Sequence, residues 1–274
     1  MKIYVTISFL ATVLTGFMPV NSAPSQDAGQ IRYAKCLDMA DRSPDRAINL
    51  ALVWKGEGGG VPARHCEAVG LSRLGEYAEA AIRLEMIATD MRVGKDMPIR
   101  AGKRLVGTSA MLADMYGQAA NAWLLGGQYG KAEAAIQFGL SLAGKNSKQE
   151  TELLLDRARI AAADHDFEKS LADLETIYKR DTRRQDILVL LASSARLLGK
   201  HDRALEAITE YIDAFPDDVS GHLEHGNLLD AMGKPGAARK SWLKVLTLTA
   251  VGTDADAARA NIERMDVHKP VLDE

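Results

Sequence analysis

The chain has 274 residues, a length that fits one or two ordinary domains or one elongated stack of repeats. Hydrophobic residues make up 47% of it and aromatic residues only 5%, and the abundance of Ala and Leu favours helices over strands. The formal net charge is -3, and the 34 basic and 37 acidic residues are interspersed. We therefore expect no basic face for nucleic acid or for an anionic membrane.

The N-terminus is typical of a secretory signal peptide. Lys2 supplies one positive charge, an apolar stretch runs from Ile3 to Phe17, and Pro19 and small residues follow. We predict a signal peptide over residues 1–22, cleaved after Ser22, and a disordered N-terminus over residues 23–30. The alternative is an uncleaved membrane anchor, although Pro19 interrupts a segment that is barely long enough to span. We expect an exported protein, periplasmic or secreted, without a stable membrane span after signal cleavage.

Residues 31–60 are predicted to form a degenerate N-terminal helix pair, with Ser43 as the N-cap and Pro44 as the first residue of the second helix. Cys36 and Cys66 are the only cysteines of the chain, and an even pair in an exported protein suggests one disulfide. Closing that loop would stabilise the fold by about 3 to 4 kcal/mol. Two separate free or buried thiols are the alternative. The sequence has no CxxC motif that would favour a metal or redox site.

A short motif recurs along the rest of the chain. The segment 199–204, Gly-Lys-His-Asp-Arg-Ala, has a counterpart 34 residues later at 233–238 and a looser one 34 residues earlier at 165–170. Two further copies begin at Gly127 and Gly75, at offsets of 38 and 52 residues between neighbours. Self-similarity at such a period indicates a repeat architecture.

At these positions the chain resembles the tetratricopeptide-repeat (TPR) family, whose unit of two antiparallel helices, A and B, contains a turn of the form G-x-Y-x-x-A. The glycine ends helix A in a left-handed backbone conformation, and the alanine is small because the two helices approach closely there. The third unit has His165 in place of the glycine and Ser170 in place of the alanine.

The resemblance implies an all-α fold, a right-handed α-solenoid of antiparallel helix pairs (TPR superhelix). About five units are expected over residues 61–252, followed by a C-terminal capping helix over 253–268 and a tail over 269–274. The first two units are separated by 18 residues more than the period of 34 requires. We expect these residues to form a loop and to lengthen the next helix A.

Two short patterns are candidates for chemistry. His222 and His225 have a spacing that can hold a metal on one helical face, but the repeat places both against helix B, where an interior or edge histidine is expected. The glycine-rich stretch from Lys55 to Gly60 lacks the GK[ST] ending of a phosphate loop. The sequence has no Gly-x-Ser-x-Gly motif, and both cysteines are expected to be paired. We therefore expect no catalytic residues, no metal and no cofactor.

The family resemblance also indicates where a partner would bind. TPR stacks usually bind peptides on their concave surface, which is lined mainly by helix A. The candidate peptide-binding residues at such positions are Asp114, Asn121, Arg159, Arg196, Asn227 and Asp230. We predict an exported, non-catalytic scaffold or adaptor that binds an unidentified protein or peptide in its concave groove. The alternatives are a structural homo-oligomer of the cell envelope and a metal-dependent protein centred on His222 and His225.

Overall fold

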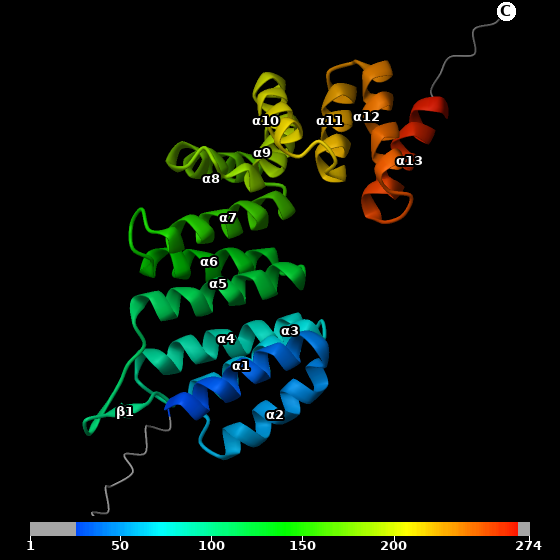
Figure 1. The fold of residues 1–274 in the computed structure, drawn as a ribbon. Helices are drawn as coiled ribbons and strands as arrows, with labels where there is room; N and C mark the ends of the chain where they lie inside the picture. The colour runs from blue at the N-terminus through cyan, green and yellow to red at the C-terminus, as the bar shows by residue number, and fades with distance from the viewer. Residues whose placement is uncertain (1–25, 268–274) are drawn as a thin grey trace, which may run out of the picture.

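The computed structural model describes residues 26–267, and these form a stack of helices (Figure 1). The helices are α1 (Gln26–Arg42), α2 (Pro44–Gly56), α3 (Gly60–Arg73), α4 (Tyr77–Arg92), α5 (Ser109–Leu125), α6 (Tyr129–Leu142), α7 (Lys148–Ala163), α8 (Phe167–Arg180), α9 (Leu188–Leu197), α10 (His201–Ala214), α11 (Val219–Ala231), α12 (Pro235–Leu248) and α13 (Thr253–Val267). A short 3-10 helix, η1 (Gln185–Ile187), precedes α9, and two short strands, β1 (Ile99–Arg100) and β2 (Lys103–Arg104), lie between α4 and α5. The predicted signal peptide and the predicted C-terminal tail lie outside the described residues.

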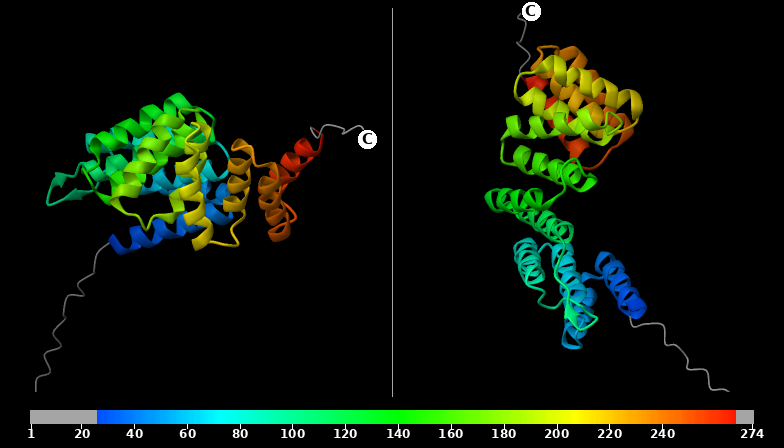
Figure 2. Two further views of the ribbon diagram at one scale, coloured as in Figure 1. Left: turned by 90° about the horizontal axis from the view of Figure 1, so that it is seen from above. Right: turned by 90° about the vertical axis from the view of Figure 1, so that its left-hand side faces the viewer.

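Consecutive helices pack as hairpins, and the hairpins stack on one another. The pairs are α3 with α4, α5 with α6, α7 with α8, α9 with α10 and α11 with α12, and the second helix of each pair packs on the first helix of the next. Helix α1 packs on α2 and α3 at one end of the stack, and α13 packs on α12 and α11 at the other end (Figure 2). The expected all-α solenoid is confirmed.

The turn between helices A and B explains the recurring glycine. Gly75, Gly127, Gly199 and Gly233 have φ values of 85°, 67°, 72° and 71°, in the left-handed region that a glycine adopts at little cost. His165 occupies the corresponding position in the third unit and has a φ of 62°. The backbone of this turn is therefore retained even where the glycine is absent, and the third unit keeps the register of its neighbours.

The small residue of the motif lies where helices A and B meet. Ala80, Ala132, Ala204 and Ala238 are fully buried, and so is Ser170, the corresponding residue of the third unit. The Ser170 hydroxyl is 2.9 Å from the Ser194 hydroxyl on α9. This hydrogen bond satisfies a buried polar group that would otherwise cost free energy, which explains why a serine is tolerated there.

The segment between α4 and α5 is a loop, as expected, but it contains a β-hairpin that the sequence did not predict. Ile99 pairs with Arg104, and Arg100 with Lys103, around a two-residue turn. Ala101 and Gly102 have φ values of 48° and 73°, and two positive φ angles are what a two-residue type I′ turn requires. The following helix α5 has 17 residues, against 14 in α3, so the predicted lengthening of helix A is confirmed.

Two expectations for the N-terminal region were wrong. Helix α1 begins at Gln26, so residues 26–30 are helical rather than disordered. Gly29 is the weakest helix former among them, and its cost of about 1 kcal/mol is tolerated in a helix that is stabilised further along by packing on α2 and α3. Pro44 is the first residue of α2 as predicted, but the Ser43 side chain makes no capping hydrogen bond.

Candidate functional site

Polar side chains connect several of the helices A to the next one along the stack. Between α5 and α7, Asn121 Nδ2 donates to Asp156 Oδ2 over 2.9 Å, and Gln149 Nε2 donates to Asp114 Oδ1 over 2.5 Å. Asn121 and Asp156 are 35 residues apart in sequence, about one repeat. We call this series of bonds between helices A the polar ladder.

The polar ladder continues in the C-terminal half. Arg196 on α9 binds Glu224 on α11 through two bonds of 2.6 and 3.2 Å, and the Glu224 residue is only 6% exposed. Asn227 Oδ1 accepts from Trp242 Nε1 over 3.2 Å and from Asn261 Nδ2 on α13 over 3.0 Å. Asp230 accepts from a guanidinium nitrogen of Arg264 over 2.9 Å. These side chains hold neighbouring units together.

The six predicted peptide-binding residues therefore fall into two groups: two line a groove, and the other four, which do not line it, bond to neighbouring side chains. Asp114 and Asn121 belong to the ladder and also line a groove. Arg159 is half exposed and bonds to Asp156 on its own helix over 3.1 Å. Arg196, Asn227 and Asp230 lie further along the stack, and each bonds to a neighbouring helix A or to α13.

The groove has a volume of about 720 Å³ and is formed by α1, α3, α5 and α7. Its polar lining comes from Tyr33, His65, Asp114, Gln118, Asn121, Lys148, Gln149, Glu152 and Asp156, and Met115 and Leu153 add apolar surface. Asp114, Lys148 and Glu152 are exposed to solvent. Amides, carboxylates and a lysine together offer both donors and acceptors to a polypeptide backbone.

A hydrogen-bonded chain closes the α1 end of the groove. The Tyr33 hydroxyl is 2.7 Å from His65 Nδ1, and His65 Nε2 is 2.7 Å from Gln118 Oε1. With its proton on Nε2, His65 donates to Gln118 and accepts from Tyr33, so the neutral imidazole satisfies both neighbours. Burial lowers the pKa of His65 and raises the pKa of Tyr33. Sequence reasoning missed Tyr33 and Gln118, because their contact with His65 depends on how α1, α3 and α5 are stacked.

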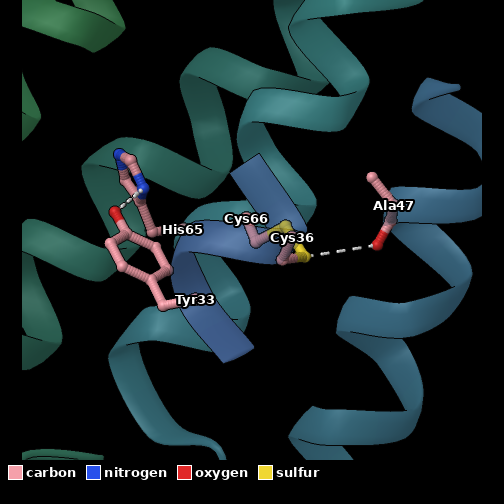
Figure 3. The surroundings of a disulfide bond; sticks show 5 residues. All are labelled: Tyr33, Cys36, Ala47, His65 and Cys66. Atoms are coloured by element: carbon pink, nitrogen blue, oxygen red, sulfur yellow. Dashed lines mark hydrogen bonds between the residues drawn. A yellow bond between two sulfur atoms is a disulfide. The ribbon is translucent and has the colours of Figure 1, made fainter. Parts of the chain in front are cut away.

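The predicted disulfide fixes this end of the groove. Cys36 on α1 and Cys66 on α3 are joined, with their Cα atoms 6.1 Å apart, and both residues are fully buried. Figure 3 shows Tyr33 beside Cys36 on α1 and His65 beside Cys66 on α3, so the covalent link and the hydrogen bond join the same two helices. The positions of the two cysteines could have predicted the contact between Tyr33 and His65, because a disulfide between Cys36 and Cys66 brings these neighbouring residues together.

Negative charge prevails in the groove. Asp114, Glu152 and Asp156 line it together with the single ammonium group of Lys148, among the residues that the structure describes. Burial raises the pKa of Asp156, while hydrogen bonds from Asn121 and Arg159 oppose that effect. A cationic group brought beside Asp156 would favour its charged form.

Comparison with solved structures shows which known proteins share this fold. The structure of PilW, a widely conserved type IV pilus biogenesis factor, is 12% identical in sequence, with a TM-score of 0.65 over 86% of this chain and 100% of its own. YrrB, a TPR protein with an unusual peptide-binding site, is 14% identical, with a TM-score of 0.53 over 81% of this chain and 98% of its own. The chain has the TPR fold. No family profile and no curated protein sequence matches it.

A third TPR protein, from Parabacteroides merdae, is 12% identical and has a TM-score of 0.55 over 87% of this chain and 86% of its own. All three likenesses cover most of both chains, so the TPR fold extends over nearly the whole described stack. Within residues 26–267, no helix is both long and apolar enough to cross a membrane.

The two histidines with metal-like spacing have separate protein partners. His222 Nε2 is 2.7 Å from the Pro216 carbonyl oxygen, and His225 Nδ1 is 3.2 Å from the Ser241 hydroxyl on α12. The contact of His225 with helix B agrees with the position that the repeat register predicts. Burial lowers the pKa of His225, and the nearby His222 lowers it further.

Proposed function

We propose that this protein is an exported, non-catalytic scaffold that binds an extended segment of a partner protein in the groove between α1, α3, α5 and α7. The observation that carries the proposal is the groove itself, whose volume of about 720 Å³ and mixed donors and acceptors suit a polypeptide backbone. The polar ladder and the disulfide hold the groove in shape without a ligand, which reduces the entropy lost on binding.

The charge of the groove narrows the class of partner. Three carboxylates and one ammonium group line it, so a segment with Lys or Arg side chains would complement it. Export is supported by the buried disulfide, because such bonds persist mainly in oxidising compartments. The solved TPR structure of YrrB, with its unusual peptide-binding site, gives a precedent for the fold.

Site-specific photo-crosslinking tests the proposal. A benzophenone side chain replaces Glu152 in the groove or, as the control, Glu168 on α8; both positions are solvent-exposed. Irradiation of cells that produce the protein naturally should join a partner polypeptide to the first position and not to the second. Equal capture at both positions, or none at either, would contradict the groove proposal. A cross-link between two copies of this chain would instead support the homo-oligomer.

Charge reversal supplies the matched second test. Asp114→Lys adds a cation to the groove, whereas Glu168→Lys makes the same change of charge on α8. Asp114 is exposed and loses only its bond to Gln149, so the fold should persist, as circular dichroism will verify. We expect the yield of the cross-linked partner to fall by about tenfold for Asp114→Lys alone, which corresponds to about 1.4 kcal/mol of binding free energy.

A further inference from the structure

A second cleft lies at the same end of the stack, on a different face of α3. It has a volume of about 480 Å³ and lies between the α2–α3 turn, α3, α4 and the hairpin segment that separates α4 from α5. Gly60, Arg64 and Glu67 line it from α3. These three share one helical face, which lies about 100° or more around the helix from His65, the groove residue.

The hairpin segment is held firmly against α3 and α4. Val61 N–H donates to the Asp96 carbonyl over 3.3 Å, and Gly107 N–H donates to the Met91 carbonyl over 2.7 Å. Gly60 has a φ of 56°, and a Cβ atom there would lie 2.6 Å from the Asp96 carbonyl oxygen. The residues inserted between the first two repeats therefore form a fixed wall of this cleft.

Cationic groups outnumber carboxylates around the cleft. Its lining includes Lys55, Arg64, Arg83, Lys95 and Arg104. The carboxylates that pair with them are Glu67, Glu79, Asp90 and Asp96. Glu67 is shared, because it lies 3.0 Å from Lys55 Nζ and 3.3 Å from an Arg83 nitrogen.

Two guanidinium groups of the lining have N–H donors available for a ligand. Arg83 Nε is buried and has no hydrogen-bond partner within the described part of the chain. Such a group costs free energy until an acceptor reaches it. Arg104 has no carboxylate partner among residues 26–267, and its hydrogen bond goes to the Met97 carbonyl oxygen over 3.3 Å. Both side chains line the cleft.

We infer that this cleft binds an oxyanion, a carboxylate or phosphate group, attached to an apolar group. Arg83 and Arg104 would bind the anion, because the fork of N–H donors on a guanidinium matches two oxygens of either group. Met86, which is 52% exposed, lies with Ile87 and Met97 in the same lining and would contact the apolar part. This site is separate from the proposed groove, and the chemistry it selects is opposite in charge.

Nuclear magnetic resonance of the arginine Nε–Hε groups tests the inference on the full chain. The probes are N-acetyl-leucine, its uncharged amide N-acetyl-leucinamide, and inorganic phosphate. We expect N-acetyl-leucine to shift the Arg83 and Arg104 resonances saturably, and the amide to leave them unchanged. If phosphate but not N-acetyl-leucine gave saturable shifts, the site would be supported and the bound anion would be a phosphate group rather than a carboxylate.

Variants separate the cleft from general charge effects. Arg104→Gln, on the exposed hairpin, should weaken N-acetyl-leucine or phosphate binding by about tenfold, as read from the Arg83 resonance. Arg183→Gln removes a side chain that is 89% exposed and distant from the lining, and it should change nothing. Absence of any saturable shift, equal shifts with the amide, or unchanged affinity in Arg104→Gln would overturn the inference. None of these results depends on the groove.

Discussion

Replacing Arg196 by alanine should destabilise the fold, because its partner Glu224 would remain buried without a cation. The two side chains are 18% and 8% exposed and bond over 2.6 Å. Removing one partner of a buried ion pair costs about 3 to 5 kcal/mol, and the partial exposure of Arg196 favours the lower end, about 3 kcal/mol. This expectation differs from that for a ligand-binding arginine on an exposed surface, whose removal usually changes stability by less than about 0.5 kcal/mol.

Urea unfolding followed by circular dichroism would measure the loss, and hydrogen exchange in α9 and α11 would show whether it is local, since solenoids can unfold in parts. Burial already raises the pKa of Glu224, and loss of Arg196 should raise it further. A folded-state pKa above the unfolded one means that the stability penalty is absent below the unfolded pKa, grows as the pH rises above it, and reaches its full value above the folded pKa. The Arg196→Ala deficit should therefore be larger at about pH 7.5 than at about pH 5.

Two controls complete the Arg196 experiment. Arg183→Ala breaks a pair with Asp181 whose arginine side chain is 89% exposed, and it should cost less than about 0.5 kcal/mol. The double variant Arg196→Met with Glu224→Leu should recover most of the loss, because replacing both partners leaves no buried charge. If Arg196→Ala were no more costly than Arg183→Ala, the assignment of Arg196 to the polar ladder would be refuted.

Three further predictions concern the turn, the disulfide and the groove histidine. His165→Gly should stabilise the fold by about 0.5 kcal/mol, as measured by urea unfolding. A left-handed φ costs a non-glycine residue about 1 to 2 kcal/mol, and glycine removes this cost but loses more chain entropy on folding, so the net gain is small. Any destabilisation would contradict this prediction. Replacing Cys36 and Cys66 together by serine should cost about 3 kcal/mol, and reductant should lower the melting temperature of the native protein but not that of the variant. Because burial lowers the pKa of His65, the native protein should lose stability as the pH falls from about 6.5, the unfolded pKa of histidine, through the lower folded pKa. His65→Gln should reduce that loss in thermal melts across this pH range. An unchanged pH profile in the variant would contradict the role given to His65.

The repeat could be predicted from the sequence because it depends on the local backbone conformation and size of single residues. A left-handed residue at the end of helix A and a small residue in helix B are conditions on single positions, so they recur visibly at a period of 34 residues. The substitution of His165 for glycine did not obscure the unit, since its neighbours kept the register. The disulfide could also be predicted from the sequence, because the chain has only two cysteines.

The site was harder to predict because its contacts cross between units. Arg196 occupies a helix A position at which the family resemblance led us to expect a ligand contact, but its bond to Glu224 spans 28 residues and depends on how α11 stacks on α9. Asn121 similarly meets Asp156 across 35 residues. The hairpin was missed because each strand has only two residues, too few to show an alternating pattern.

Helix α3 connects the two proposed sites through three consecutive residues. His65 lines the groove, Cys66 forms the disulfide with α1, and Glu67 lines the cationic cleft. Successive helical residues point about 100° apart, so one turn of helix can serve three different neighbours. Groove and cleft both use elements added to the regular stack, α1 for the groove and the hairpin segment for the cleft. Both added elements pack against α3, so the two proposals place the binding of partners at this end of the stack rather than in its C-terminal half.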